Sequence, residues 1–309
     1  MPRGHPAGYR PRRPGQQVHP GAIVSGAETG FVTSYGRRLV YRRTGDGPLL
    51  VCHPGGPGFS GAEFGDLAGL DARLTLVLFD PRGTGGSDPP ADPTAYSLDD
   101  YVSDLEELRR HLRVDRVSLL GFSHGGMVTM AYACTHSERV ERLVLANTLA
   151  RLGKAQQDEA ERAIAERADE PWHAEAVAAI RAEEEGAYET PEEMTRLWRS
   201  MAPLYFARWD EGARVFVDET SGMGNVESLQ LFNANPPDLV GDLGRITAPT
   251  LVLTGERDFI CGLASAREIA GAIAGARLVI IPEAGHFTYF EQPERFAEEV
   301  GDFLTGAPA

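Results

Sequence analysis

The chain has 309 residues, enough for one large α/β domain or two smaller ones. A formal charge of −15 at pH 7 argues against nucleic acid or an anionic membrane as the main partner. No apolar run approaches the length of a membrane span. The 3 cysteines do not make a disulfide framework, so a reducing cytoplasm is the expected location.

Residues 1–27 are rich in proline, glycine and arginine. Because they contain no apolar segment of the kind that a secretory signal needs, we expect a flexible tail. Residues 30–34 and 38–43, joined through Tyr35 and Gly36, are predicted to form an antiparallel pair of strands that opens the folded part.

Short apolar runs alternate with helical patterns in two parts of the chain. Such alternation is typical of a mostly parallel sheet that helices cover on both faces. Between these parts, residues 150–245 are rich in alanine and glutamate and carry no strong strand pattern, so we expect an inserted helical cap. The predicted strands span residues 48–52, 74–79, 117–120, 142–146, 249–254 and 277–281, and the predicted helices span residues 98–112, 126–133, 264–274 and 291–304.

The sequence Gly121-Phe122-Ser123-His124-Gly125 stands between a predicted strand and a predicted helix. A serine in such a tight turn needs flanking residues without a Cβ atom, because neighbouring backbone comes close. The helix that follows would direct its free N–H groups and positive dipole end at the place where an oxyanion forms. The pattern therefore predicts Ser123 as a nucleophile, and the alternative interpretation is an ordinary glycine-rich turn.

An activated serine needs a histidine within hydrogen-bond reach. His286 follows the last predicted strand, and ligand sites of open α/β sheets lie beyond the carboxyl ends of the strands. We therefore expect His286 to be the base. Among the other histidines, His53 stands at the end of a predicted strand, and the turn is expected to hold the His124 ring facing away from the serine.

The acid of such a triad should come between the serine and the histidine in the sequence. Asp258 directly follows the predicted strand at residues 249–254 and is the expected acid. Glu256 competes with it but is expected to point elsewhere, and the preceding strand ends at Asn147 rather than at a carboxylate. A role for Asp258 as the N-cap of a helix is the alternative.

Backbone N–H groups are the expected oxyanion donors: one from His124 and one from Gly55 or Gly56. Adjacent glycines permit a close approach of substrate, although this stretch could also be a simple turn. Residues 80–87 lack the Gly-Lys-Ser/Thr ending of a phosphate-binding loop, so Arg82 and Asp80 are expected to tie loops together. Metal ligands do not cluster in the sequence, and no cofactor is expected.

With these residues placed, the chain resembles the α/β-hydrolase superfamily over residues 28–306, and within it the proline iminopeptidase and tripeptidyl aminopeptidase clan of serine peptidases. The resemblance implies the α/β-hydrolase fold, with an eight-stranded, mostly parallel sheet, helices on both faces and an inserted helical cap. Residues 28–149 and 246–309 would form the core domain and residues 150–245 the cap. The matching motifs lie at residues 54–58, 80–87, 121–125, 255–258 and 284–287.

Two departures count against a true proline iminopeptidase. Those enzymes usually have Gly-Gly-Ser-Trp-Gly-Ser at the elbow, where this chain has Gly-Phe-Ser-His-Gly-Gly, which is closer to esterases and lactonases of the same superfamily. They also carry a cap glutamate just before a His-Tyr-Phe segment, and this glutamate binds the free amine of the substrate. Here residues 202–206 read Ala-Pro-Leu-Tyr-Phe, which leaves Glu219 or Asp218 as substitutes.

We therefore expect a metal-free serine hydrolase that cleaves a small molecule or short peptide, at an amide or ester bond, through an acyl-enzyme. A carboxylesterase or lactonase is the alternative, and a ligand-binding receptor of the same fold is the alternative from another class. The cap is expected to wall an apolar pocket, although its aromatic residues could equally form the core of the cap. The expected pocket residues are Phe122, Trp198, Tyr205 and Phe206.

Overall fold

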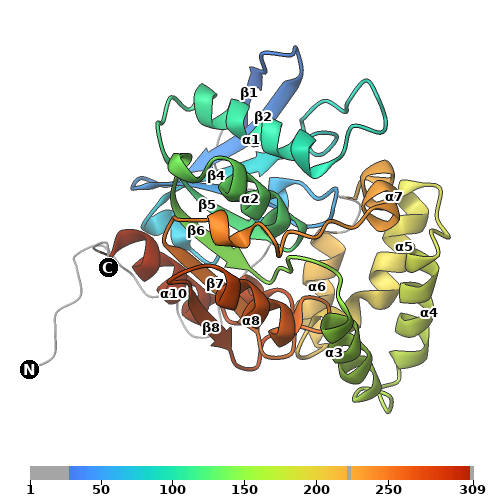
Figure 1. The fold of residues 1–309 in the computed structure, drawn as a ribbon. Helices are drawn as coiled ribbons and strands as arrows, with labels where there is room; N and C mark the ends of the chain where they lie inside the picture. Colours follow the sequence, from blue (N-terminus) through green and yellow to red (C-terminus); the bar gives the residue numbers. More distant parts are fainter. Residues whose placement is uncertain (1–27, 221–223, 307–309) are drawn as a thin grey trace, which may run out of the picture.

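A single sheet organises the computed structural model, which describes residues 28–220 and 224–306. The sheet has 8 strands in the order β1-β2-β4-β3-β5-β6-β7-β8 (Figure 1). β2 pairs antiparallel with β1 and β4, and all other neighbours pair parallel. This topology confirms the predicted fold class, whereas the expected N-terminal tail lies outside the described residues. The strands are β1 (Glu28–Val32), β2 (Arg38–Thr44), β3 (Leu49–His53), β4 (Thr75–Asp80), β5 (Val117–Phe122), β6 (Val140–Ala146), β7 (Thr250–Gly255) and β8 (Arg277–Ile281).

Helices cover both faces of the sheet because neighbouring residues of a strand point to opposite faces and most are apolar. On β5, Leu119 packs in the cluster formed with α1, α2 and α8, whereas Leu120 packs in the opposite cluster formed with η1 and α10. The helices of the two layers are α1 (Leu98–His111), α2 (His124–Thr135) and α8 (Gly262–Ala272) on one face, and η1 (Gly61–Phe64), η2 (Leu70–Ala72) and α10 (Pro293–Thr305) on the other.

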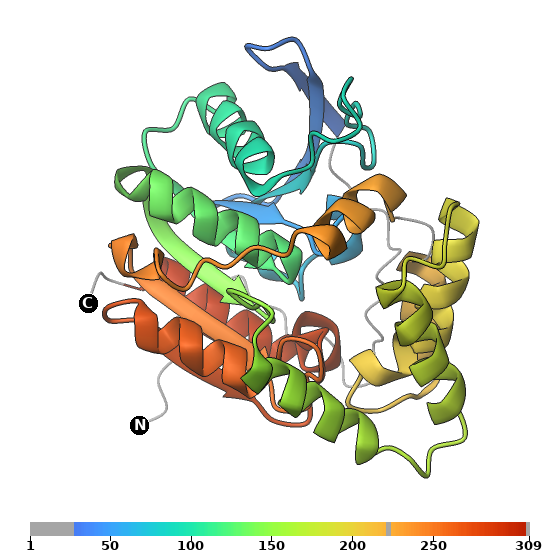
Figure 2. The same cartoon turned by 45° about the vertical axis from the view of Figure 1, so that its right-hand side comes forward.

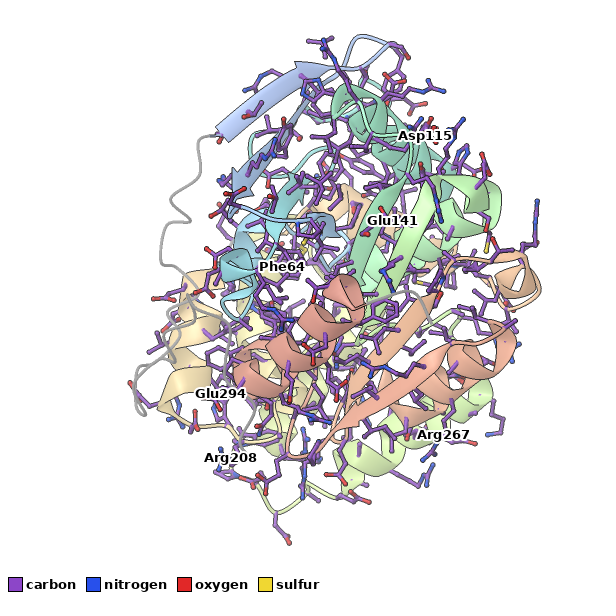
Figure 3. All side chains as sticks on the ribbon, turned by 90° about the vertical axis from the view of Figure 1, so that its left-hand side faces the viewer. Phe64, Asp115, Glu141, Arg208, Arg267 and Glu294 are labelled. Carbon is purple, nitrogen blue, oxygen red and sulfur yellow. The ribbon has the colours of Figure 1, made fainter. Side chains whose placement is uncertain are left out.

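The outer shell of the molecule is charged, as Figure 3 shows for the labelled residues Asp115, Glu141, Arg267 and Glu294, all of them exposed. Phe64, labelled in the same view, is buried in the core cluster that also contains residues of α10. No helix in the described ranges is long and apolar enough to cross a membrane.

A separate group of helices lies between β6 and β7 and stands beside the sheet (Figure 2). These helices fall within residues 150–245, and we use the name cap for that range. They are α3 (Lys154–Ala165), α4 (His173–Glu184), α5 (Pro191–Met201), α6 (Glu211–Thr220) and α7 (Val226–Ala234), with the short turns η4 (Ala202–Tyr205) and η5 (Leu243–Arg245). Two further short elements lie outside the cap: η3 (Ser137–Arg139) precedes β6, and α9 (Thr288–Glu291) precedes α10.

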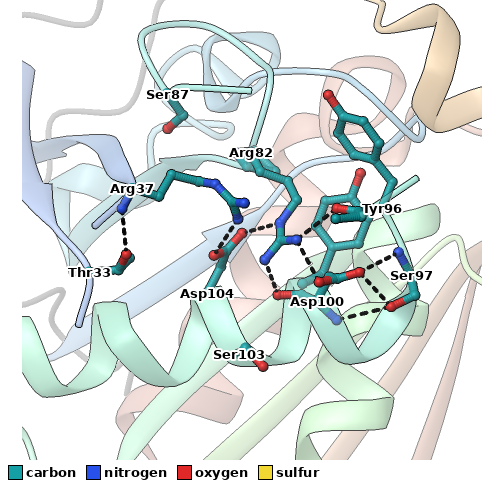
Figure 4. Close-up of polar contacts among 12 residues, drawn as sticks. Thr33, Arg37, Arg82, Ser87, Tyr96, Ser97, Asp100, Ser103 and Asp104 are labelled. Atoms are coloured by element: carbon teal, nitrogen blue, oxygen red, sulfur yellow. Dashed lines mark hydrogen bonds and ion pairs between the residues drawn. The ribbon is translucent and has the colours of Figure 1, made fainter. Parts of the chain in front are cut away.

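A buried arginine fixes the loop that follows β4. Arg82, 2 % exposed, donates from Nε to Asp104 Oδ2 at 2.6 Å and from Nη2 to the Asp100 carbonyl at 2.6 Å (Figure 4). The carboxylate of Asp80 accepts the N–H groups of Gly61 at 2.9 Å and Gly86 at 3.1 Å. Arg82 and Asp80 therefore tie the loop to α1 and η1, which is the structural role expected from the sequence.

Candidate active site

Ser123 occupies the turn between β5 and α2, with φ 52° and ψ −122°. This conformation is strained for a residue with a Cβ atom, and hydrogen bonds from both neighbouring elements hold it in place. The Ser123 N–H donates to the Ala146 carbonyl at 3.1 Å. Its carbonyl accepts the Thr148 hydroxyl at 2.7 Å and the Gly126 N–H at 2.9 Å. The serine therefore stands at the carboxyl edge of the sheet, at the start of a helix.

Two glycines of the turn are required by close packing. A Cβ atom on Gly121 would lie 2.2 Å from Thr129 Oγ1, and one on Gly125 would lie 2.3 Å from the His53 carbonyl oxygen. Neither clash can be relieved without moving α2 away from β3 and β5. The G-x-S-x-G pattern is thus a consequence of how tightly the helix is seated.

His286, in the loop between β8 and α9, forms a buried pair with Asp258. Its Nδ1 atom lies 3.0 Å from Asp258 Oδ2 and 3.1 Å from Oδ1. The His286 N–H donates to the Tyr205 carbonyl at 2.7 Å, which fixes the backbone of the loop. Because Nδ1 is engaged by the carboxylate, Nε2 is the ring atom left for a proton from Ser123.

Asp258 follows β7 and is held as a carboxylate. Burial alone would raise its pKa, but the adjacent His286 and hydrogen bonds to the ionised form outweigh burial and hold the pKa below its usual range. Oδ2 accepts from Asn147 Nδ2 at 3.0 Å, and Oδ1 accepts from the N–H groups of Ile260 at 3.2 Å and Cys261 at 3.1 Å. Oδ1 thus also holds the turn before α8, but the N-cap residue of α8 is Cys261, so the alternative role of Asp258 as a helix N-cap is not observed.

Asn147 is a polar residue of the site whose contacts the sequence did not reveal. It follows β6 with φ 48° and is fully buried. Besides the bond to Asp258, its Nδ2 lies 3.2 Å from the Gly285 carbonyl, and its Oδ1 accepts the Thr288 hydroxyl at 2.7 Å. Its place at a strand end beside the acid was the available signal, and we interpreted it only as the absence of a carboxylate.

Ser123 and His286 line one pocket of about 250 Å³, which the cap closes on one side. Both residues belong to the described part of the chain, and no hydrogen bond joins their side chains there. Such contacts are often long in enzymes without substrate and shorten when the substrate binds. The pocket is the place where the candidate nucleophile and the candidate base meet.

One of the two expected glycine donors is engaged elsewhere. The Gly55 N–H donates to Glu63 Oε1 at 2.5 Å, so it is not free to bind an oxyanion. Gly56 lines the pocket, and so does His124, the first residue of α2. The expectation for Gly55 is therefore corrected, and the donor pair that the geometry favours is Gly56 with His124.

The aromatic residues expected in the pocket divide into two groups. Phe122, Trp198 and Tyr205 line it. Phe206 does not: it is 1 % exposed, and its ring centroid lies 5.1 Å from that of Phe287 and 5.7 Å from that of Phe216. The expectation for Phe206 was wrong because the chain turns at the end of η4, which directs Tyr205 to the pocket and its neighbour into the core.

Three glutamates line the largely apolar pocket, namely Glu63, Glu183 and Glu184. Glu183 Oε1 accepts from Asn233 Nδ2 at 2.9 Å, and burial raises the pKa of Glu183. Asp218, by contrast, is exposed and lies 3.5 Å from Arg199, and neither Asp218 nor Glu219 lines the pocket. The acidic side chains of the cap that reach the site are thus at the end of α4, a place that sequence reasoning missed.

Cys261 brings a third potential metal ligand to the acid and the histidine. The ligand atoms of Asp258, Cys261 and His286 lie within 4.8 Å of one another, and this set of donors is one that zinc accepts. However, both Asp258 oxygens already accept hydrogen bonds, and burial raises the pKa of the Cys261 thiol well above its usual value. The contacts therefore fit an acid–histidine pair better than a metal centre.

A serine on a strand-to-helix turn, with an aspartate–histidine pair at the same edge of a mostly parallel sheet, is the architecture of an α/β-fold hydrolase. The model of the alpha/beta hydrolase fold family matches residues 48–293, and the chain belongs to this family.

Related proteins narrow the class. A proline iminopeptidase of Lactobacillus crispatus is 29% identical over 290 residues, which cover 89% of this chain and 95% of that protein. A hydrolase structure from Pseudomonas aeruginosa is 31% identical with a TM-score of 0.70, covering 92% of this chain and 100% of the other. An enol-lactonase structure from Burkholderia xenovorans is 28% identical with a TM-score of 0.62, covering 90% and 100%. The chain is a hydrolase that resembles proline iminopeptidases.

Proposed function

We propose that the protein is a serine hydrolase that removes a small aminoacyl group from an amide through an acyl-enzyme. The observation that carries this proposal is the shared pocket, which is lined by Ser123 and His286 together with Glu183 and Glu184 of the cap. Proline iminopeptidases are among the relatives of the chain, and this supports an amine-bearing substrate.

The chemistry follows from the positions of three side chains. Ser123 Oγ forms a bond to the carbonyl carbon while its proton passes to His286 Nε2 and the carbonyl π electrons move to oxygen. The tetrahedral intermediate then collapses, its bond to the leaving nitrogen breaks, and that nitrogen takes the proton from His286. Water, activated by the same histidine, releases the acyl group. Asp258 orients the ring and stabilises its protonated form.

The substrate amine would lie against the end of α4. An ammonium group brought into an apolar pocket needs an ionised partner, because leaving the charge unpaired there is costly. Glu183 and Glu184 offer carboxylates in the pocket, and Asn233 orients the first of them. The apolar remainder of the pocket, with Trp198 and Met194, would hold the side chain of the aminoacyl group.

An ester or lactone substrate is the second candidate. The structural likeness to an enol-lactonase and the largely aromatic and aliphatic lining both favour it. In that case the same acyl-enzyme forms, and the cap glutamates play no part in binding.

A substrate panel separates these candidates. Proline and alanine arylamides, N-acetylated arylamides, p-nitrophenyl esters and lactones should be compared on the wild type and on Ser123→Ala. We expect hydrolysis of the free-amine arylamides, loss upon acetylation, and loss of both turnover and fluorophosphonate labelling in Ser123→Ala. Retained labelling would overturn the nucleophile, and tight binding of a ligand without turnover would favour a receptor.

The matched variants Glu183→Gln, Glu184→Gln and Glu185→Gln test the amine site. Glu183 is partly buried, so the loss of an ion pair there should raise KM for free-amine arylamides about 10- to 100-fold, whereas Glu184 is exposed and its variant should have a smaller effect. Glu185 is exposed and does not line the pocket, so its variant should behave as the wild type. Equal KM in all three variants would favour the ester or lactone alternative.

A further inference from the structure

The carboxyl group of Glu63 lies behind the loop that carries the oxyanion donor. We call residues 54–58 the oxyanion loop. Glu63 belongs to η1 and is 2 % exposed. Its Oε1 atom accepts the Gly55 N–H at 2.5 Å, while the same side chain reaches the wall of the pocket that contains Ser123. Glu63 thus contacts both the oxyanion loop and the pocket.

The oxyanion loop packs directly on the nucleophile. A Cβ atom on Gly55 would lie 3.1 Å from Phe122 Cδ1 and 3.2 Å from Ser123 Cβ. A shift of the loop therefore changes the distance between its N–H groups and the carbonyl that Ser123 attacks. With the Gly55 N–H engaged by Glu63, the Gly56 N–H is the loop donor that remains for the oxyanion.

The surroundings of the Glu63 carboxyl are aromatic. The ring of Tyr289, which is close to Glu63, lies 5.7 Å from the ring of Phe64 and 5.3 Å from that of Phe122. The hydroxyl of Tyr289 on α9 interacts electrostatically with Glu63 and has no hydrogen-bond partner in the described structure, and His286 lines the same pocket. Tyr289 offers no positive charge to an ionised Glu63.

We propose that Glu63 is a positioning residue, which holds the oxyanion loop against Ser123 and acts as a neutral carboxylic acid. The neutral acid supplies the carbonyl oxygen that accepts from Gly55. An ionised Glu63 would place a second negative charge beside the oxyanion, and like charges at such separation in a poorly solvated site disfavour each other strongly. Burial raises the pKa of Glu63 to about 8, in agreement with a neutral form at pH 7.

The variants Glu63→Gln and Glu63→Ala test this role. Glutamine keeps the shape and the acceptor oxygen but cannot ionise. We expect the activity of the wild type to decline above pH 8, and we expect Glu63→Gln to retain kcat within about threefold at pH 7 and to lose this decline. Glu63→Ala removes the acceptor and should lower kcat about 10- to 100-fold with KM changed less than about threefold.

The readouts are turnover of a p-nitrophenyl ester and the rate of fluorophosphonate labelling between pH 6 and 10. Labelling also develops charge on an oxygen in the oxyanion hole and needs no knowledge of the natural substrate. Asp66→Asn, three residues further along the chain and outside the pocket, serves as the control and should leave both profiles unchanged. Circular dichroism and melting temperature show whether each variant is folded. If Glu63→Ala does not fold, Glu63→Gln still tests the proposal.

The inference rests on the proposed acyl transfer at Ser123. Different outcomes would contradict the proposed function and the role of Glu63. Labelling that persists in Ser123→Ala overturns the proposed function. Normal Ser123-dependent labelling, with unchanged rates in Glu63→Ala or an unchanged alkaline decline in Glu63→Gln, overturns the role of Glu63 alone.

Discussion

Asn147 shows how a buried neutral side chain can support a charged one. Its amide donates to the Asp258 carboxylate and accepts from the Thr288 hydroxyl, so it joins the ends of β6 and β7 to the His286 loop. A buried carboxylate needs such donors, because each one favours the ionised form. The left-handed φ of 48° also suits asparagine better than most residues.

We predict that Asn147→Ala lowers kcat about 10- to 100-fold and leaves KM nearly unchanged, because Asp258 loses a donor and holds His286 less firmly. The free energy of unfolding should fall by about 1–3 kcal/mol, since the Thr288 hydroxyl also loses its partner. Ester turnover and urea unfolding measure the two effects.

Thr288→Val is the control for this variant. It removes the bond to Asn147 Oδ1 but keeps the bond from Asn147 to Asp258, so it should lower stability while most of kcat remains. If both variants lower kcat equally, Asn147 stabilises the loop only and does not orient the acid.

Which site residues could be predicted from the sequence depends on how local their requirements are. The elbow around Ser123 is specified by glycines within two positions, and His286 and Asp258 follow strands directly, so their chemistry and order indicated their places. Asn147 acts through a contact with Asp258, 111 residues away in the chain, and Glu63 acts through a contact with the backbone of Gly55, which no sequence pattern marks. A single buried polar contact of this kind produces no periodic pattern in the sequence, so it could not be predicted.

At the scale of elements, the buried ion pair of Arg82 and Asp104 fixes α1 against the loop after β4. The Asp104 side chain is 0% exposed and that of Arg82 is 2% exposed. Arg82 also lies 2.8 Å from Asp100, in the first turn of α1. Removing one partner from a buried pair leaves the other charge poorly compensated, which costs far more than the loss of a surface pair.

Asp104→Asn should therefore lower the free energy of unfolding by about 3–5 kcal/mol. Asp158→Asn is the matched control, because it breaks an exposed pair with Lys154 and should cost less than about 1 kcal/mol. Guanidinium unfolding measures both. Equal stability of the two variants would mean that water enters the Arg82 site and replaces the lost partner.

The elements of the core were easier to predict than those of the cap. The parallel strands are short apolar runs that end at glycine or polar residues, and β8 was predicted at its observed bounds, Arg277–Ile281. The cap carries helical spacing throughout, so its division into α3 to α7 depends on breaks such as Gly186 at φ 68° and on packing that periodicity does not encode. Because periodicity does not encode this packing, Phe206 was predicted to line the pocket although it lies in the core.

At the scale of the whole molecule, one carboxylate joins the cap to the His286 loop. Glu291, in α9, accepts the N–H of Ala207 on Oε2 at 2.7 Å and the N–H of Gly285 on Oε1 at 2.8 Å. These two residues belong to the segments that flank Tyr205 and His286, which are themselves joined by a backbone bond of 2.7 Å. The position of the cap and that of the His286 loop therefore depend on the same side chain.

Burial raises the pKa of Glu291 to about 7, above its ordinary value of 4.5. The folded protein thus holds this proton more tightly than the unfolded chain, and between pH 4.5 and 7 folding takes up a proton. The contribution of Glu291 to stability is therefore fully present below pH 4.5 and is lost as the pH rises to 7. Glu291→Gln removes this titration, so the wild type should lose about 2–3 kcal/mol relative to the variant between pH 4.5 and 8. Urea unfolding across this range measures the difference.

Glu298→Gln, which changes an exposed pair with Arg295, is the control and should leave the dependence of the unfolding free energy on pH unchanged. A wild type and a Glu291→Gln variant with parallel pH profiles would show that the two N–H donors keep Glu291 ionised throughout, and the cap would then be joined to the loop by a permanent charge.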